Sequence, residues 1–354
     1  MGLIENLIKS VKDSQPSPHI LGVDIGSSSI KVIELEDKKG VLTLLTYGEI
    51  QLGPYSEKPL GAAVQLESKQ EQEALVDVIR ESAVKSRQGV FAMPLSASFI
   101  STATLNAGDE ADLNALVRVE ARKIIPASLS EVTLDWAEID TAEEESGRSV
   151  LIAAIQNSAI ERLNILMQFV GMKGSPTEIE CFSAARTVPK SENTVIIDFG
   201  ASSAKMYIMR NGILSRMHRI NVGGAQVTQQ FATLQEIDFE AAEMQKIQLT
   251  SRESAYSTLK GVYSKVYGRA LREFRQVLNH YTTDMGVEFP VIYLCGGVSL
   301  YEGLAAMVQE STQIPTEIIN PFTNVAYPAF MEDAMSEIGP SFVPALGAAM
   351  RHFE

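Results

Sequence analysis

The chain has 354 residues, of which 45% are hydrophobic and 21% charged, a composition typical of a globular protein with enough apolar residues for two domain cores. Its 44 acidic and 30 basic residues give a formal charge of −14. A nucleic-acid-binding protein normally carries a basic surface, so we expect no nucleic-acid partner. Cys181 and Cys295 lie far apart in apolar segments, which favours a reducing compartment over a disulfide or zinc framework. No apolar run approaches membrane-spanning length and no cleavable signal pattern occurs, so we expect a cytoplasmic protein.

Residues 1–18 are expected to form a segment of their own. MGLIENLIKSVKD places apolar residues at helical spacing, at Leu3, Ile4, Leu7, Ile8 and Val11. Such a short amphipathic helix suits contact with a membrane, with a partner or with its own domain. QPSPH, residues 15–19, is typical of a linker.

The next part of the chain begins with strands and then changes character. The pattern predicts a strand before a tight turn at Gly26–Ser28, a strand after it, a strand over 41–52 and a helix over 71–86. Residues 90–172 are typical of a small α+β subdomain inserted into a larger domain. Its expected elements are a strand over 90–105, a helix over 112–125 stopped by Pro126, strands over 132–139 and 149–155, and a helix over 158–172 capped by Ser158.

The second half returns to strands and helices. Its pattern predicts strands over 195–220, a helix-rich region with a buried aromatic stripe over 227–286, a strand over 291–295, a helix over 302–311 and a final helix over 340–353. We therefore expect a first domain that consists of residues 19–89 and the insert 90–172. The second domain would comprise 173–226, the helix-rich region 227–286 and the return 287–338. A C-terminal helix over 339–354 would close on the first domain.

A repeat links the two halves. VDIGSSSIKVI, residues 23–33, aligns with IDFGASSAKMY, residues 197–207. Asp24 matches Asp198, Gly26 matches Gly200, and Lys31 matches Lys205, all at a separation of 174 residues. This separation is about one domain, so the pattern indicates a duplicated unit rather than a solenoid repeat.

Each copy predicts a hairpin whose small turn residues expose backbone N–H groups. Glycine allows close approach, and consecutive amides form a concavity that binds anions. Two such hairpins, one from each domain, would grip a polyphosphate from both sides. An aspartate beside phosphates is repelled unless a hydrated Mg²⁺ lies between them, so Asp24 and Asp198 are candidate metal-site residues.

Two glycine pairs extend the candidate site. LCGGVSLYEGL, residues 294–304, ends a strand in Gly296-Gly297, where the backbone can approach a flat ligand such as adenine. INVGGAQVTQQF, residues 220–231, places Gly223-Gly224 at the start of a helix, where N–H groups suit phosphate.

These motifs, in this order, resemble the actin, sugar kinase and heat-shock chaperone ATPase superfamily from about His19 to Phe353. The block 90–172 lies where the cell-division protein FtsA carries its subdomain. Several segments are similar to the PilM family of type IV pilus assembly proteins: GVDIGSSSIKVIEL, VEARKIIP, AAIQNSAIERLNILMQFVGM, VIIDFGASSAKMYI, INVGGAQVTQQF, IYLCGGVSLYEGL and IINPF. The resemblance implies an α/β, actin-like ATPase fold, with two duplicated domains around a nucleotide cleft and an FtsA-type insert in the first.

The resemblance also implies roles for single residues. Asp24 and Asp198 would be the magnesium and catalytic aspartates for ATP or ADP. In the superfamily a glutamate that precedes a proline positions the attacking water. Glu180 occupies the position of this glutamate, but Cys181 replaces the proline. The resemblance therefore implies at most weak ATPase activity. Glu243 and Lys246, in FEAAEMQKIQL, would contact ribose and adenine. The remaining implied nucleotide-binding residues are Gly26, Ser27, Ser28, Ser29, Lys31, Gly200, Ala201, Ser202, Gly223, Gly224, Gly296, Gly297 and Ser299.

For function, the resemblance implies a cytoplasmic ATP-binding component of the pilus assembly platform at the inner face of the inner membrane. It would bind the N-terminal cytoplasmic peptide of a PilN-like membrane protein in a groove beside the insert, with 90–99 and 122–128 as candidate lining segments. Other pilus motor or platform proteins and self-assembly are further implied contacts. Membrane contact would be indirect or through the N-terminal helix.

Two alternatives remain open on the sequence. An FtsA-like filament and membrane tether normally has a C-terminal amphipathic helix, and this chain ends at MRHFE after its last predicted helix. A sugar-kinase-type phosphotransferase needs a carboxylate base over a sugar hydroxyl, and QLGPYSEKPLGA in the first domain has no motif of that kind.

Overall fold

The computed structural model of the chain describes residues 18–106, 112–139, 147–172, 177–250 and 252–354. The expected N-terminal helix over 1–13 lies outside these ranges. Within them, no helix is both long and apolar enough to cross a membrane.

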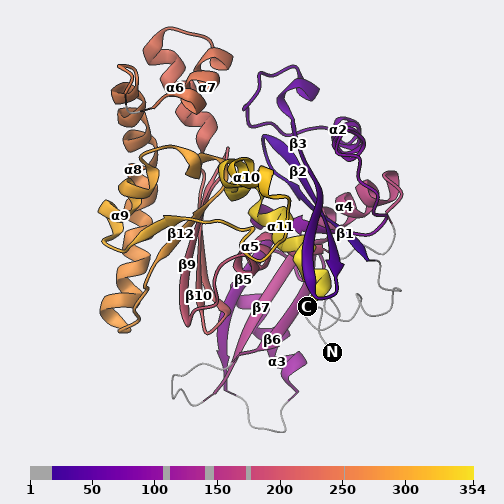
Figure 1. Ribbon diagram of the computed structural model, residues 1–354. Coiled ribbons are helices and arrows are strands. Elements are labelled where there is room, and N and C mark those ends of the chain that lie inside the picture. The colour runs from indigo at the N-terminus through magenta and orange to yellow at the C-terminus, as the bar shows by residue number, and fades with distance from the viewer. Residues whose placement is uncertain (1–17, 107–111, 140–146, 173–176, 251) are drawn as a thin grey trace.

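Two five-stranded sheets with the same strand order form the body of the molecule (Figure 1). The first has the order β3-β2-β1-β4-β8, with β1(His19–Ile25), β2(Ser29–Lys38), β3(Val41–Gln51), β4(Gly89–Met93) and β8(Thr177–Ile179). The second has the order β11-β10-β9-β12-β13, with β9(Asn193–Phe199), β10(Ala204–Arg210), β11(Ile213–Ile220), β12(Ile292–Cys295) and β13(Thr316–Ile318). In each sheet three antiparallel strands are followed by two parallel ones, so the duplication read from the two hairpins extends to the whole sheet.

The two hairpins are paired in the same register. Asp24 lies opposite Lys31 in β1 and β2, and Asp198 lies opposite Lys205 in β9 and β10. Apolar residues on both faces of β1 and β9 are buried, which is typical of central strands covered by helices on both sides. Each hairpin turn therefore follows the end of a central strand, which the sheet holds in place.

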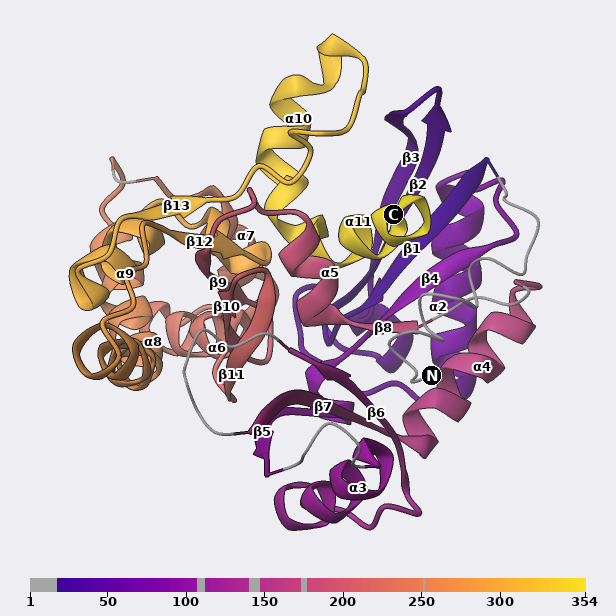
Figure 2. The same cartoon turned by 90° about the horizontal axis from the view of Figure 1, so that it is seen from below.

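A smaller third sheet has the order β5-β7-β6, with β5(Ser98–Leu105), β6(Val132–Glu138) and β7(Arg148–Gln156). The helix α3(Leu113–Ile124) packs its apolar residues on one face of this sheet. In Figure 2 this unit lies below the other two sheets.

The third sheet begins later in the chain than residue 90, where the sequence placed the start of the insert. The strand expected over 90–105 is two strands, because Pro94 ends β4 and a short 3₁₀ turn, η2(Leu95–Ala97), leads into β5. β4 pairs with β1 and β8 in the first sheet. Only β5 belongs to the third sheet. We therefore propose 94–156 as the bounds of the insert.

Helices cover both faces of the first sheet. One face carries α2(Ser68–Glu81) and α4(Asn157–Phe169), and the other carries α5(Glu180–Arg186) and α11(Val343–Met350) (Figure 2). α11 lies very close to its neighbours, because a Cβ at Gly22 would be 1.9 Å from the Ala345 carbonyl oxygen and one at Gly347 1.9 Å from that of Ser183. α10(Glu332–Ile338) precedes α11 and stands in front of the sheets in Figure 1.

The second sheet packs against a group of four helices. These are α6(Gly224–Gln235), α7(Phe239–Gln248), α8(Tyr256–Asn279) and α9(Leu304–Thr312). The aromatic stripe of α8 is core as expected, with Tyr263, Tyr267 and Phe274 buried against the sheet.

Two local predictions were wrong. α4 begins at Asn157 and no side chain makes a cap hydrogen bond there, so Ser158 is inside the helix and does not cap it. α2 ends at Glu81, five residues before the expected end, because Ala83 adopts a left-handed backbone (φ 51°) that stops the helix.

The final helix over 340–353 consists of α11 flanked by the 3₁₀ turns η6(Gly339–Phe342) and η7(Arg351–Phe353).

Candidate nucleotide-binding cleft

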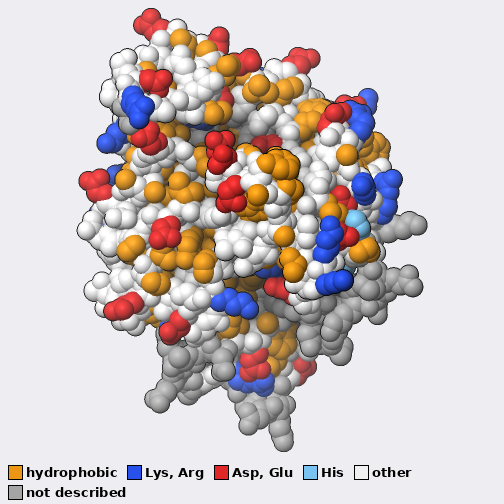
Figure 3. Space-filling model, viewed as in Figure 1, with side chains coloured by type: hydrophobic (Ala, Val, Ile, Leu, Met, Phe, Trp, Pro, Cys, Tyr) orange, Lys and Arg blue, Asp and Glu red, His pale blue; other side chains and the backbone are white. Residues whose placement is uncertain are grey.

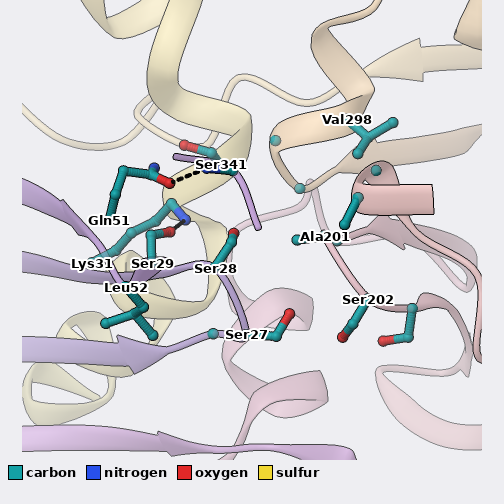
Figure 4. Close-up of a pocket in the computed structure, with 18 of the residues that line it drawn as sticks. Ser27, Ser28, Ser29, Lys31, Gln51, Leu52, Ala201, Ser202, Val298 and Ser341 are labelled. Atoms are coloured by element: carbon teal, nitrogen blue, oxygen red, sulfur yellow. Dashed lines mark hydrogen bonds between the residues drawn. The ribbon is translucent and has the colours of Figure 1, made fainter. Parts of the chain in front are cut away.

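The two hairpin turns face each other across a cavity of about 940 Å³ (Figure 4). In each turn the glycine N–H donates to the carbonyl three residues on, Gly26 to Ser29 at 3.0 Å and Gly200 to Ser203 at 2.9 Å. The N–H groups inside the turns, at Ser27, Ser28, Ala201 and Ser202, have no acceptor in the described part of the chain. Both turns therefore offer backbone donors to an anion in the cavity.

The cavity collects nearly all the residues that the sequence singled out. Its lining includes Asp24, Gly26, Ser27, Ser28, Ser29, Lys31, Glu180, Asp198, Gly200, Ala201, Ser202, Gly224, Glu243, Lys246, Gly296 and Gly297. Gly223 and Ser299 are not part of that lining.

Those two residues support the cleft from behind. The Ser299 hydroxyl is buried and donates to the Gly296 carbonyl at 2.7 Å, so it fastens its own turn instead of facing a base. A Cβ at Gly223 would be 2.3 Å from the Ala201 carbonyl oxygen, so this glycine allows α6 to lie against the second hairpin. The amides of Gly224 and Ala225 donate to the carbonyls of that hairpin at 3.0 Å each and are not free for a phosphate.

A buried cluster of charges lies beneath the two turns. Lys205 Nζ is 2.7 Å from Glu180 Oε2 and 3.0 Å from Asp198 Oδ2. Burial alone would lower the pKa of Lys205, but the two carboxylates outweigh it and the pKa is raised, so the ammonium stays charged. The cleft therefore contains a fixed cation between the two halves of the molecule.

Asp24 stands apart from this ion pairing. Burial raises the pKa of its carboxyl from 3.8 to about 6, against the lowering effect of Lys31. Its side chain has no hydrogen-bond or ion-pair partner among the described residues, although it lines the cavity. A half-buried carboxylate with unused oxygens fits a hydrated Mg²⁺ that is held mainly by phosphates. No cluster of three or more metal-ligating side chains occurs in the described ranges, so the phosphates would have to supply the other ligands.

Lys31 extends the first hairpin toward the cavity. Its Nζ donates to Ser29 Oγ at 2.6 Å and lies 3.2 Å from Glu49 Oε1 (Figure 4). In the same view Gln51 accepts a hydrogen bond from the amide of Gly61 at 3.2 Å. This bond holds Gly61, in the loop after β3, at the wall of the cavity.

The opposite end of the cleft is formed by α6, α7 and the glycine turn after β12. Lys246 Nζ is 2.6 Å from Glu243 Oε2 and 2.8 Å from Thr228 Oγ1, and burial lowers the pKa of this lysine. Gly296 has φ +84°, and a Cβ there would be 2.4 Å from Asp198 Oδ1. Glycine is therefore required where the turn passes the second aspartate.

Glu180, the residue expected to position the attacking water, is a buried carboxylate with two hydrogen-bond partners. Its Oε1 accepts the Leu95 amide at 2.7 Å and its Oε2 accepts Lys205 Nζ at 2.7 Å. Both carboxylate oxygens are therefore engaged, and the residue joins the second half of the molecule to the turn that enters the third sheet.

The sequence reasoning missed Lys205 as a site residue. The signal was present, because Lys205 is the repeat partner of Lys31. It also missed Gln51 and the ion pair between Arg162 and Glu71, which line the same cavity. Those residues come from different elements, and no local motif links them to the hairpins.

Two duplicated sheets that close on a cleft with paired glycine-serine hairpins define the actin-like ATPase fold. The chain matches the model of the family described as type IV pilus assembly protein PilM over residues 22–353. The chain belongs to this family, and its role accordingly lies in type IV pilus assembly.

Solved structures agree with this fold. A PilM-PilN type IV pilus biogenesis complex matches with a TM-score of 0.79 and 22% identity, covering 96% of this chain and 100% of that one. The ethanolamine utilization protein EutJ from Carboxydothermus hydrogenoformans matches with a TM-score of 0.54 and 14% identity, over 98% and 99% of the two chains. MreB5 of Spiroplasma citri bound to ADP matches with a TM-score of 0.54 and 11% identity, over 96% of each chain.

Proposed function

We propose that the cleft binds ATP or ADP with Mg²⁺. The observation that carries this proposal is the pair of opposed hairpins, each with two backbone N–H groups that no described protein group uses. Lys205 and Lys31 supply positive charge beside the phosphates, and Asp24 would hold the metal through water. The similar MreB5 structure has ADP bound, which is consistent with a nucleotide in a fold of this kind.

Mg²⁺ would neutralise phosphate charge, and the protein groups would position the nucleotide. Because both Glu180 oxygens already accept hydrogen bonds, the residue is poorly placed to take a proton from water. We therefore expect at most weak ATP hydrolysis. Calorimetric titration with ATP, with and without Mg²⁺, tests the binding, and phosphate release tests the turnover. Absence of ATP binding with Mg²⁺ would refute this part of the proposal.

We also propose that the chain binds the N-terminal cytoplasmic peptide of a PilN-like membrane protein, as part of a platform at the inner face of the inner membrane. The structural similarity to a PilM-PilN complex supports this proposal. Residues 90–93 of the candidate peptide-binding segment 90–99 belong to β4, which is fully buried, and cannot contact a peptide. Ser96, in the turn after β4, is exposed. The end of α3 and the residues after it supply a second edge, where residues 122–123 and 126–128 are exposed.

Calorimetry with the peptide of the cognate partner, with and without ATP and Mg²⁺, tests this second part. We expect saturable binding that is lost with a scrambled peptide. Ser128→Arg should weaken it because the large cation obstructs the proposed peptide contact, whereas Ser191→Arg, on an exposed site outside the third sheet, should not. Equal affinity for the native and scrambled peptides would contradict the proposal.

A further inference from the structure

The outer face of α8 is basic although the protein as a whole is acidic. Five side chains on this face are exposed: Lys260, Lys265, Arg269, Arg272 and Arg275. The single acidic residue of the helix, Glu273, pairs with Arg269 at 2.7 Å and with His218 at 3.2 Å. The other four cations have no carboxylate partner among the described residues. α8 thus carries an excess of positive charge in a chain of −14.

Two glycines interrupt this face. A Cβ at Gly261 would meet no atom within 4 Å, and one at Gly268 would meet only Arg272, at an ordinary 3.5 Å. Glycine inside an exposed helix is unfavourable relative to alanine, and here no internal contact requires it. The missing side chains leave the helix backbone open to close approach from outside at Gly261 and Gly268, and Ser257 and Ser264 beside them are exposed and small.

The opposite charge is concentrated further along the same chain. No lysine or arginine occurs from residue 276 to residue 350. Within that stretch α10 exposes Glu332, Asp333 and Glu337, and Phe330 just before it is 87% exposed. Acidic and hydrophobic side chains lie side by side over α10 in Figure 3.

The basic face and the acidic projection cannot meet within one molecule. Figures 1 and 2 place α8 on the outer side of the second sheet and α10 on another side of the molecule. α8 of one copy can therefore contact α10 of another, and this contact is heterologous, because different surfaces are used on the two copies.

We propose that a second copy of this chain docks its α10 projection on the α8 face, with Phe330 lying over the glycines and the three acidic side chains beside the cations. The uncovered backbone at Gly261 and Gly268 suits an aromatic side chain of a protein partner. A lipid bilayer is a less suitable partner, because its electrostatic attraction to the cations gains nothing from uncovered backbone. The contact is small, because α8 is about 36 Å long and α10 is two turns. We therefore expect weak, salt-sensitive association that repeats head to tail.

Sedimentation velocity of the full chain, over a concentration series at low and high salt, tests the proposal. The first variant is Lys265→Glu/Arg272→Glu on α8, and the second is Asp333→Lys/Glu337→Lys on α10. Each should weaken association by more than about tenfold, because like charges would then face each other. The control Lys85→Glu/Arg87→Glu makes the same charge change on exposed residues of the segment after α2 and should associate like the native protein.

Mixing the two variants provides the decisive measurement. Each variant keeps one native surface and has one reversed surface, and the two reversed surfaces are complementary. An association regained only in the mixture supports the α8–α10 pairing and also shows that both variants fold. Three results would overturn it: a native protein that stays monomeric at low salt, association that survives the α8 reversal, or a mixture that stays dissociated. Binding of the monomer to phosphatidylglycerol vesicles, lost with the α8 variant, would assign the face to a membrane instead.

Discussion

Asp24 is a carboxyl group whose environment opposes its charge. Its pKa rises from 3.8 to about 6 because of burial, so between these pH values the folded protein holds a proton that the unfolded chain has released. The free energy of unfolding therefore falls as pH rises through this window and stays reduced at neutral pH. A ligand that brings positive charge to Asp24 would remove this penalty.

Asp24→Asn should consequently stabilise the ligand-free protein at pH 7 by about 2 kcal/mol, and the gain should vanish below about pH 4. Urea unfolding in EDTA at the two pH values measures the difference. The same variant should bind ATP more weakly than the native protein when Mg²⁺ is present. A stability gain that is equal at both pH values would show that Asp24 is not the group that titrates.

Lys205, unlike Asp24, has an environment that favours its charge. Its ammonium forms ion pairs with two buried carboxylates and reduces the repulsion between them. Lys205→Met should lower the free energy of unfolding at pH 7 by about 3 kcal/mol, since Glu180 and Asp198 are then left without a counter-charge. Lys31→Met is the matched control, because Lys31 forms an ion pair with a single carboxylate among the described residues, the partly exposed Glu49, and we expect a loss of about 1 kcal/mol or less. Thermal unfolding compares the two; equal losses would contradict the ion-pair geometry.

At the scale of elements, Glu180 joins three parts of the fold. It begins α5, it accepts the amide of Leu95 in the turn between β4 and β5, and it accepts Lys205 from β10. The entry to the third sheet is therefore fastened to the base of the cleft by one side chain.

Glu180→Ala should leave the Leu95 N–H and Lys205 with fewer partners and lower the free energy of unfolding by about 2–4 kcal/mol. Hydrogen exchange should then speed up at Leu95 and its neighbours in the turn. Glu180→Gln is the matched variant, because it retains an acceptor for the amide while losing the charge, so exchange at Leu95 should stay slow. Slow exchange at Leu95 in the Ala variant, or fast exchange there in the Gln variant, would refute the assigned hydrogen bond.

The elements that sequence predicted best are those with local causes. The hairpins at Gly26 and Gly200 follow from small turn residues between alternating strands, and their repetition pointed to the duplicated sheets. The β4–β5 segment was predicted less well, because its apolar run is continuous across Pro94 and only strand pairing shows that it changes sheet. Side-chain direction was not predictable either: Ser299 belongs to a glycine turn that lines the cleft, yet its hydroxyl points back to its own backbone.

At the scale of the whole molecule, the loop after β3 and α7 come close together across the cleft. Gly61, in the loop after β3, has φ +77°, and a Cβ there would be 2.5 Å from Glu243 Cδ on α7. Glu243 cannot simply move aside, because Lys246 and Thr228 hold its carboxylate. The closed position of the loop therefore depends on the absence of a side chain at residue 61.

Gly61→Ala should force the loop away from α7 and speed nucleotide dissociation, on the proposed nucleotide function, while it lowers the free energy of unfolding by about 1–2 kcal/mol through backbone strain. Gly40→Ala is the matched control, because Gly40 has φ +85° with nothing within 4 Å of the added Cβ. It should have a similar effect on stability and none on dissociation. Stopped-flow release of a fluorescent ATP analogue separates the two variants. If both release nucleotide at the native rate, the loop at Gly61 does not retain the ligand, and closure must come from the relative position of the two sheets.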